Sequence, residues 1–242
     1  AEGRVRAGDP PVPVRKPSEP LPADAPLQVD PGASDRFVSR GGLKLAGALE
    51  HCGIVVDGLV CLDVGQSTGG FTDCLLQRGA ASVLAVDVGR AQLHSKLRDD
   101  PRVTLLEGTN ARDLPEVGPI AFFVADLSFI SLRKVLPAVA ARLAGETPGV
   151  VLLKPQFEAG PAAVPRGGVI KDSRVHDRVC EEFVAWATGN GWAICGIIAS
   201  PIRGGDGNVE FLVHGRAPGG PPVEAPPLST LVDDVLGEVG RR

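Results

Sequence analysis

Methionine is absent from the sequence, lysine is scarce, and no two cysteines form a C-x-x-C pair. Because Ala1 stands where a translation product begins with methionine, we expect the chain to be part of a longer protein. The five cysteines are odd in number and lack the close spacing of zinc ligands, which disfavours a structural zinc site. Reduced thiols are typical of a cytoplasmic protein, so we expect cytoplasmic localisation and no metal.

Long apolar runs are also missing. No stretch approaches the roughly 18 consecutive apolar residues of a membrane-spanning helix, and no signal-peptide pattern is visible, so we expect no membrane partner. The formal charge of −4 gives no strong basic field, although a local basic patch can still bind nucleic acid. With 242 residues, 43% of them hydrophobic, the chain fits one α/β domain with small appendages.

Short apolar runs alternate with helical patterns over residues 41–216. Strands interleaved with helices at this spacing predict an α/β fold with a mostly parallel, seven-stranded sheet and helices on both faces. The last two strands, joined by "RGGDGN", predict an antiparallel hairpin at the sheet edge. We expect strands at residues 60–64, 82–88, 103–108, 121–127, 149–156, 192–202 and 209–215, and helices from about 41 and at 69–79, 91–99, 131–145 and 173–191.

The two ends of the chain differ from this pattern. Residues 1–30 are rich in proline and aspartate, with short β-like pieces such as "VPV" and "LQV", and residues 31–40 have the composition of a linker. Residues 217–242 predict a second linker followed by a short helix at 228–238. We therefore expect one main domain between two small appendages.

The stretch "DVGQSTGGF" at residues 63–71 follows the first long strand and has the composition of a ligand-binding loop. A phosphate-binding P-loop needs a lysine after its last glycine, but Phe71 occupies that position. A dinucleotide fingerprint needs G-x-G-x-x-G, but Ser67 replaces its second glycine. Both interpretations are therefore disfavoured.

The remaining pattern is D-x-G-x-[ST]-x-G-G, with a second acid, Asp87, at the end of the next strand. Such an acid accepts hydrogen bonds from a ribose diol, and glycines let the backbone approach an adenosyl group, as in sites for S-adenosylmethionine (SAM). The alternative is a loop whose glycines serve only packing and whose acids are caps or surface groups. We expect the cofactor-binding residues to be Asp63, Gly65, Gln66, Ser67, Thr68, Gly69, Asp87, Asn110, Asp126 and Phe129.

Two of these residues keep a second interpretation. Asn110 follows the third strand, where it could contact an adenine edge or act as a turn residue. Phe129 could pack on the adenine or in the core.

Four charged residues lie at or near the ends of predicted elements. Asp126 and Lys154 close apolar strands, where an unpaired charge is costly unless it faces a site. Glu210 opens the last strand, and Lys44 lies in the helix after Gly41-Gly42. The alternatives are a lysine at the sheet rim for Lys154 and an exposed helical lysine for Lys44.

Two lysines and two acids beside a methyl donor suit methylation of a weakly acidic group such as a ribose hydroxyl. Lys154 is the candidate base, because a desolvated lysine can accept a proton. Asp126 and Glu210 would orient it and the substrate, and Lys44 would place a second positive charge near the developing oxyanion.

Six motifs in order resemble the TlyA family: "FVSRGGLKL", "CLDVGQSTGGFTDCLLQRGA", "VLAVDVG", "LLKPQFEAG", "GGVIKD" and "SPIRGGDGNVEFL". Members are FtsJ-like, SAM-dependent ribosomal RNA 2′-O-methyltransferases that are also described as hemolysins. The resemblance covers roughly residues 36–215 and implies a Rossmann-like class I methyltransferase fold. It also implies a catalytic Lys-Asp-Lys-Glu tetrad at Lys44, Asp126, Lys154 and Glu210, and a cytidine ribose in small- or large-subunit ribosomal RNA as the substrate.

The chain departs from this family in two places. Gln66 stands where members usually carry alanine, which puts a polar group in the cofactor loop. The family begins with a complete S4-type RNA-binding domain, whereas residues 1–30 resemble only its C-terminal half. We therefore expect ribosomal RNA or a ribosomal subunit as the partner, with weaker RNA binding than a complete S4 domain would give.

Three arginines next to Gly-Gly pairs, Arg36, Arg40 and Arg203, are candidate RNA-phosphate ligands, or else ordinary surface residues. Two further functions stay open at this point. One is a membrane-active hemolysin, which the absence of a spanning or basic amphipathic segment disfavours. The other is a non-catalytic RNA-binding scaffold, which the intact tetrad disfavours.

Overall fold

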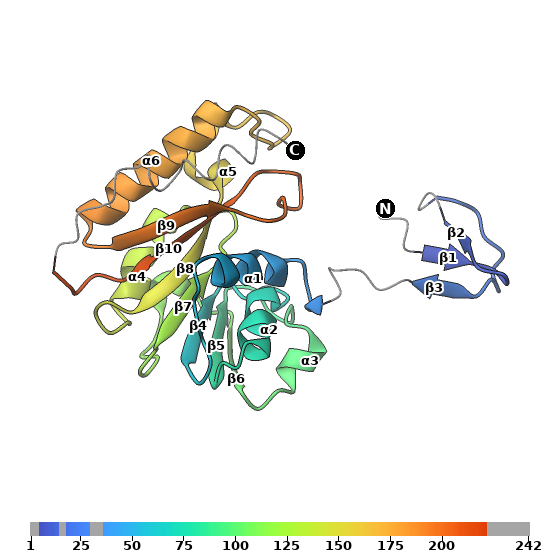
Figure 1. Cartoon of the computed structure of the whole chain (residues 1–242), viewed down its shortest axis with the longest axis horizontal. Helices are drawn as coiled ribbons and strands as arrows, with labels where there is room; N and C mark the ends of the chain where they lie inside the picture. Colours follow the sequence, from blue (N-terminus) through green and yellow to red (C-terminus); the bar gives the residue numbers. More distant parts are fainter. Residues whose placement is uncertain (1–4, 15–17, 30–35, 222–242) are drawn as a thin grey trace.

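A computed structural model describes residues 5–14, 18–29 and 36–221 of the chain. Residues 5–29 contain a small antiparallel sheet in which β1 (Val5–Ala7) lies between β2 (Val12–Pro13) and β3 (Leu27–Val29). β2 is formed by the first two residues of the "VPV" piece and β3 by the "LQV" piece that the sequence indicates. Figure 1 shows this small sheet apart from the large one, and the expected helix at 228–238 lies outside the described residues.

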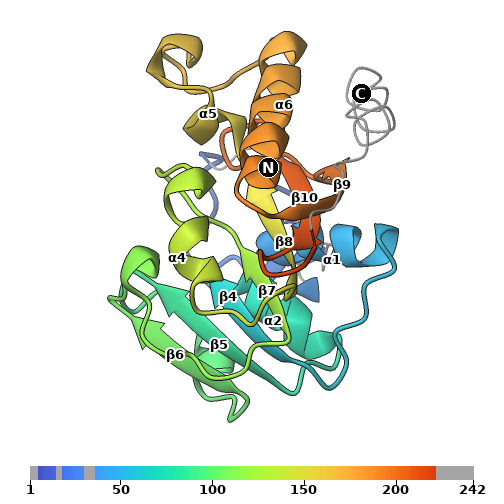
Figure 2. The ribbon, with the colours of Figure 1, turned by 90° about the vertical axis from the view of Figure 1, so that its left-hand side faces the viewer.

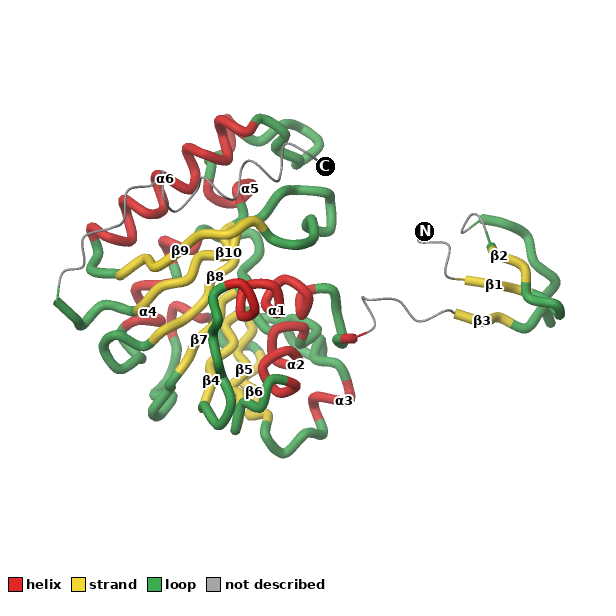
Figure 3. Tube along the Cα trace, viewed as in Figure 1, coloured by secondary structure: helices red, strands yellow, loops and turns green. Residues whose placement is uncertain are grey.

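The main sheet has the seven strands that the sequence predicts, in the order β6-β5-β4-β7-β8-β10-β9 (Figures 1 and 3). Five neighbouring strands are parallel, and β10 runs antiparallel between β8 and the edge strand β9. The predicted mostly parallel sheet with an antiparallel hairpin is therefore confirmed. The strands are β4 (Val60–Val64), β5 (Ser82–Asp87), β6 (Val103–Glu107), β7 (Phe122–Ala125), β8 (Pro148–Leu153), β9 (Ala193–Ala199) and β10 (Phe211–Arg216).

Helices cover both faces of the sheet, and each face has its own apolar core (Figure 2). Because strand side chains alternate between faces, Val124 and Leu152 pack on one core while Phe123 and Leu153 pack on the other. The first core is closed by α1 (Gly41–His51), α2 (Gly70–Gln77) and α3 (Ser95–Arg98), and the second by α4 (Leu136–Ala140) and α6 (Ser173–Gly189).

Two predicted helices are shorter than expected. The 131–145 pattern becomes the 3-10 turn η3 (Leu132–Lys134) followed by α4, because Pro137 at the start of a helix has no N–H to continue the preceding turn. The 91–99 pattern gives only α3, since Ala91 has a positive φ of 56° and His94 caps the helix after it. The α6 prediction is confirmed almost to its ends.

Several short elements complete the described part of the chain. Lys154 is the N-cap of α5 (Pro155–Glu158), which begins directly after β8, so the predicted strand ends at Leu153. The other turns are η2 (Ala111–Asp113) and η4 (Pro161–Ala163). Among the described residues, no helix has the length and apolar character that crossing a bilayer needs.

Candidate active site

The loop between β4 and α2 follows the carboxyl end of a central strand, where ligands bind in open α/β sheets. Gly65 and Gly69 have φ of 88° and 97°, which glycine adopts without strain. A Cβ on Gly65 would lie 2.4 Å from the backbone oxygen of Asp126, so only glycine fits there. The glycine positions are therefore required both by the turn and by close backbone packing.

Asp87 fixes the other side of this loop. Its Oδ2 accepts a hydrogen bond from the Ser67 N–H at 2.9 Å, and its Oδ1 accepts one from the Gly89 N–H at 2.7 Å. Each carboxylate oxygen has a further lone pair, so both can still accept bonds from a ligand. Asp87 thus holds the loop while it presents an acceptor at the end of β5.

Asp63, at the end of β4, is fully buried. Burial raises the pKa of its carboxyl from 3.8 to about 7, although the hydrogen bond that Thr72 Oγ1 donates to Oδ2 at 2.6 Å opposes this rise. The nearby Asp126 and Asp87 carboxylates raise the pKa further. Asp63 Oδ1 has no hydrogen-bond partner.

The four charged residues form two ion pairs. Lys44 Nζ on α1 lies 2.5 Å from Glu210 Oε2, and Lys154 Nζ lies 2.6 Å from Asp126 Oδ1. Lys154 Nζ also donates a hydrogen bond to Ser128 Oγ at 3.0 Å. Both lysines are only 8% exposed, so neither is the surface lysine of the alternative interpretations.

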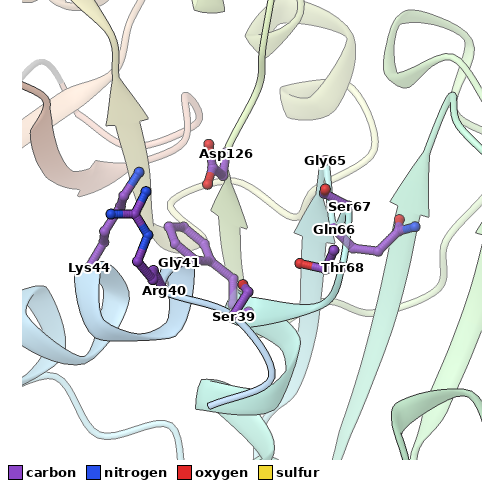
Figure 4. A pocket seen from close by; sticks show the side chains of 11 residues that line it. Ser39, Arg40, Gly41, Lys44, Gly65, Gln66, Ser67, Thr68 and Asp126 are labelled. Carbon is purple, nitrogen blue, oxygen red and sulfur yellow. The ribbon is translucent and has the colours of Figure 1, made fainter. Parts of the chain in front are cut away.

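A cavity of about 230 Å³ joins the glycine loop to Lys44 and Asp126, whereas their ion-pair partners Glu210 and Lys154 are not among the residues that line it. Figure 4 shows Arg40 and Lys44 on one side of the cavity, with Asp126 and the loop from Gly65 to Thr68 on the other. The Gln66 side chain is 3% exposed, and neither amide atom has a hydrogen-bond partner. The cavity is lined by Ser39, Arg40, Gly41, Lys44, Gly65, Gln66, Ser67, Thr68, Gly70, Phe71 and Asp126.

Five predicted cofactor residues are not among those that line the cavity: Asp63, Gly69, Asp87, Asn110 and Phe129. Asn110 Oδ1 accepts a hydrogen bond from the Arg112 N–H at 3.0 Å and caps η2, as its turn interpretation predicts. Phe129 is 90% exposed, so the core interpretation of this residue is wrong. Its ring lies 5.3 Å from the ring of Phe157.

The three arginines singled out in the sequence have different surroundings. Arg40 is exposed at the cavity, whereas the Arg36 guanidinium lies 5.0 Å above the Phe37 ring. Arg203 donates a hydrogen bond to the Gly207 carbonyl at 3.2 Å within the β9–β10 loop. Arg40 is thus the arginine of the three that lines the cavity.

Sequence reasoning missed three contributors to the site. Ser39 and Phe71 line the cavity, and Ser128 contacts Lys154. A serine just before Gly-Gly was a usable signal for Ser39, whereas nothing in the sequence indicates the Ser128 contact. Within the described ranges, no group of three or more His, Cys, Asp or Glu side chains is arranged to hold a metal ion.

Known proteins are similar to this chain in sequence and in fold. The family model of FtsJ-like methyltransferases matches residues 37–217. The 16S/23S rRNA (cytidine-2′-O)-methyltransferase TlyA of Mycobacterium tuberculosis is 44% identical over 239 residues, which cover 98% of this chain and 88% of that protein. Hemolysin A of Brachyspira hyodysenteriae is 41% identical over 185 residues, 74% of this chain and 76% of that protein.

A solved structure, a provisionally identified hemolysin from Streptococcus thermophilus, is similar over nearly the whole chain. It has a TM-score of 0.84 and 39% identity, and the match covers 99% of this chain and 88% of that one. Both the family model and relatives well above 30% identity span the described fold and the cavity. The chain therefore belongs to the family of FtsJ-like methyltransferases.

Proposed function

We propose that the chain transfers a methyl group from SAM to the ribose 2′-hydroxyl of a cytidine in ribosomal RNA. The observation that carries this proposal is the pair of buried lysine–carboxylate contacts, Lys44–Glu210 and Lys154–Asp126, beside the glycine-loop cavity. The cytidine and the ribosomal RNA come from the named activity of the Mycobacterium tuberculosis relative. Cytoplasmic localisation would follow from a ribosomal substrate.

The residues around the cavity fit a bound SAM molecule. Asp87 would accept hydrogen bonds from the ribose hydroxyls, and the glycines of the loop would let its backbone lie against the adenosyl group. The unpartnered buried amide of Gln66, which lines the cavity, supports a polar occupant. When bound, SAM supplies an electrophilic methyl group on a sulfonium leaving group.

The protein must remove the hydroxyl proton as the new carbon–oxygen bond forms. Lys154 is the proposed base, and its Nζ would take this proton. The step requires a neutral amine, and the Lys154 side chain is largely buried beside the Asp126 carboxylate. Ser128 and Asp126 together direct the nitrogen, which supports in-line positioning as the main contribution of the protein.

Lys44 has a different proposed role. Its Nζ is held by Glu210, and Lys44 lines the same cavity as Arg40 (Figure 4). A fixed positive charge stabilises the negative charge that develops on the attacking oxygen. Glu210 therefore serves mainly to hold Lys44 in place.

Exposed groups near the site support an RNA substrate. Phe129 offers an aromatic face that is 90% exposed, and aromatic faces stack on unpaired bases in RNA recognition. Arg40 is the proposed phosphate ligand, with Arg36 and Arg203 further from the cavity. We also propose that the small sheet at residues 5–29 is the C-terminal half of an S4-like RNA-binding domain.

The test is to map 2′-O-methylation on ribosomal RNA and isolated ribosomal subunits after incubation with SAM and the protein. We expect wild type and the control variant Lys134→Ala, a change at an exposed lysine, to give the same methylated cytidine. Lys154→Ala should abolish the product while SAM still binds in calorimetry. Full methylation by Lys154→Ala would refute the assignment of the base, and an unmodified RNA with wild type would refute the function.

A further inference from the structure

The segment from Asp126 to Leu132 connects β7 to η3 and carries groups that face the site. Ser128 contacts the Lys154 amine, and the next residue, Phe129, is exposed and lies against Phe157 on α5. The φ of Phe129 is 63°, a conformation that costs a non-glycine residue of order 1 kcal/mol. Such a backbone persists only where surrounding contacts hold it.

Glu158 supplies contacts of this kind from α5. Its side chain is only 2% exposed. Its Oε2 accepts a hydrogen bond from Ser131 Oγ, and its Oε1 accepts one from the Leu132 N–H, both at 2.7 Å. The Arg133 Nε lies 3.7 Å from Oε2. One buried carboxylate therefore ties the last two residues of the segment, Ser131 and Leu132, to the helix that follows Lys154, and it also lies near the charge of the next residue, Arg133.

The two hydrogen bonds that Glu158 accepts are stronger than ordinary surface contacts. A hydrogen bond to a charged, buried acceptor is stronger than a neutral one, and removing the acceptor leaves the buried donors without partners. Burial raises the pKa of the Glu158 carboxyl, and the bonds from Ser131 and Leu132 lower it. The contact is therefore suited to fixing geometry, since a small shift of the segment would break both bonds.

We propose that Glu158 is a positioning residue for methyl transfer, whose carboxylate holds the segment 126–132 so that Ser128 stays on Lys154 and Phe129 faces the RNA. This proposal rests on the proposed function. Glu158 touches neither reacting atom in it. It acts through Ser131 and Leu132, which anchor the strained turn at Phe129 between two fixed points, β7 and α5.

The test compares Glu158→Ala, Glu158→Gln and the control Glu182→Ala. Glutamine keeps an oxygen that can accept the Leu132 N–H bond. Glu182 also pairs with Arg133, at 3.4 Å, but lies on the exposed face of α6. For each variant, kcat and KM are measured separately for RNA and SAM, together with thermal unfolding and hydrogen exchange of the protein without RNA.

We expect Glu158→Ala to lower kcat/KM for RNA by up to about 100-fold, the loss that a misplacement of about 1 Å can cause. KM for SAM should change less than two-fold, and faster hydrogen exchange should be confined to residues 127–133. Glu158→Gln should recover most of the activity, and Glu182→Ala should resemble wild type.

Two results would overturn the proposal. One is unchanged RNA kinetics in Glu158→Ala. The other is an equal loss for RNA and SAM with faster exchange throughout the domain, which would indicate a general role in folding. If wild type itself fails to methylate RNA, the proposed function fails, and the exchange data still show whether Glu158 holds the segment.

Discussion

Asp63→Asn should change how the stability of the protein depends on pH. The carboxyl is fully buried, and burial raises its pKa from 3.8 to about 7. Asparagine has nearly the same shape and can still accept the Thr72 hydrogen bond, but it never ionises. The unfolding free energies of wild type and Asp63→Asn therefore differ by the cost of the buried carboxyl. That cost is the cost of retaining the proton or of ionising inside the folded protein.

The sign of the effect follows from the raised pKa. Below pH 3.8 the carboxyl is protonated in both folded and unfolded chains and makes no difference. Between pH 3.8 and about 7 the unfolded chain releases the proton while the folded chain retains it, so wild-type stability falls as pH rises. The slope is about 1.4 kcal/mol per pH unit, and the full effect is about 4 kcal/mol, reached above pH 7.

The measurement is urea unfolding of wild type and Asp63→Asn at half-unit steps from pH 4 to pH 8.5. Titrating groups distant from Asp63 contribute equally to both proteins, so the difference between the two unfolding free energies reports Asp63 together with its interaction with the nearby Asp126 and Asp87 carboxylates. We expect the variant to gain relative to wild type as pH rises and the gain to level off above pH 7. A difference that does not change with pH would refute the reasoning.

An acid whose pKa is lowered rather than raised serves as the control. Asp172 caps α6, and the hydrogen bonds from Arg174 lower its pKa. Its contribution is present above its unfolded pKa and lost as pH falls below it. Asp172→Asn should therefore show no change in relative stability between pH 5 and pH 8, where Asp63→Asn changes most.

Two further substitutions test the cavity and its surroundings. Gln66→Met should raise the free energy of unfolding by about 1–3 kcal/mol in urea, because it removes a buried amide whose donor and acceptor have no partners. Gln77→Met is the matched control and should lower the free energy of unfolding, since the Gln77 amide donates to the Arg36 carbonyl and to Asp73. Equal changes in the two variants would contradict the idea that the Gln66 amide lacks partners. Phe129→Ala should raise KM for RNA about ten-fold, the loss of one stacked base, without changing SAM affinity in calorimetry. Weaker SAM binding in that variant would instead favour contact with the cofactor.

Much of the fold follows from the sequence, because short apolar strands and amphipathic helices have different periods. The failures have local causes. Pro137 lies inside an apolar run with helical spacing, and periodicity alone gives no sign that η3 and α4 separate there. Ala91 adopts a positive φ that its residue type does not favour, so a helix from residue 91 was a reasonable expectation.

The sequence identifies the charged residues of the site, but it does not show which of them pair. Asp126 and Lys154 end neighbouring parallel strands, so topology alone brings them to one edge of the sheet. The contact of Lys44 with Glu210 spans 166 positions and depends on how α1 packs beside β10. Neither the exposure of Phe129 nor the Glu158 contacts could be predicted from residue types, because both depend on the backbone conformation between β7 and η3, where Phe129 has a positive φ.

The glycine loop and the ion pairs are parts of one rigid arrangement. The Asp126 N–H donates to the Val64 carbonyl at 3.0 Å, directly before Gly65, and the Asp126 carbonyl lies where a Cβ on Gly65 would be. The proposed cofactor loop and the proposed partner of the base thus touch through backbone alone, without a flexible side chain between them. Methyl transfer depends on holding donor and acceptor atoms close to their reacting distance, and displacements of about 1 Å reduce rates strongly. Backbone contact between β4 and β7 fixes that distance more firmly than side-chain contacts would. The same close contact requires glycine at position 65.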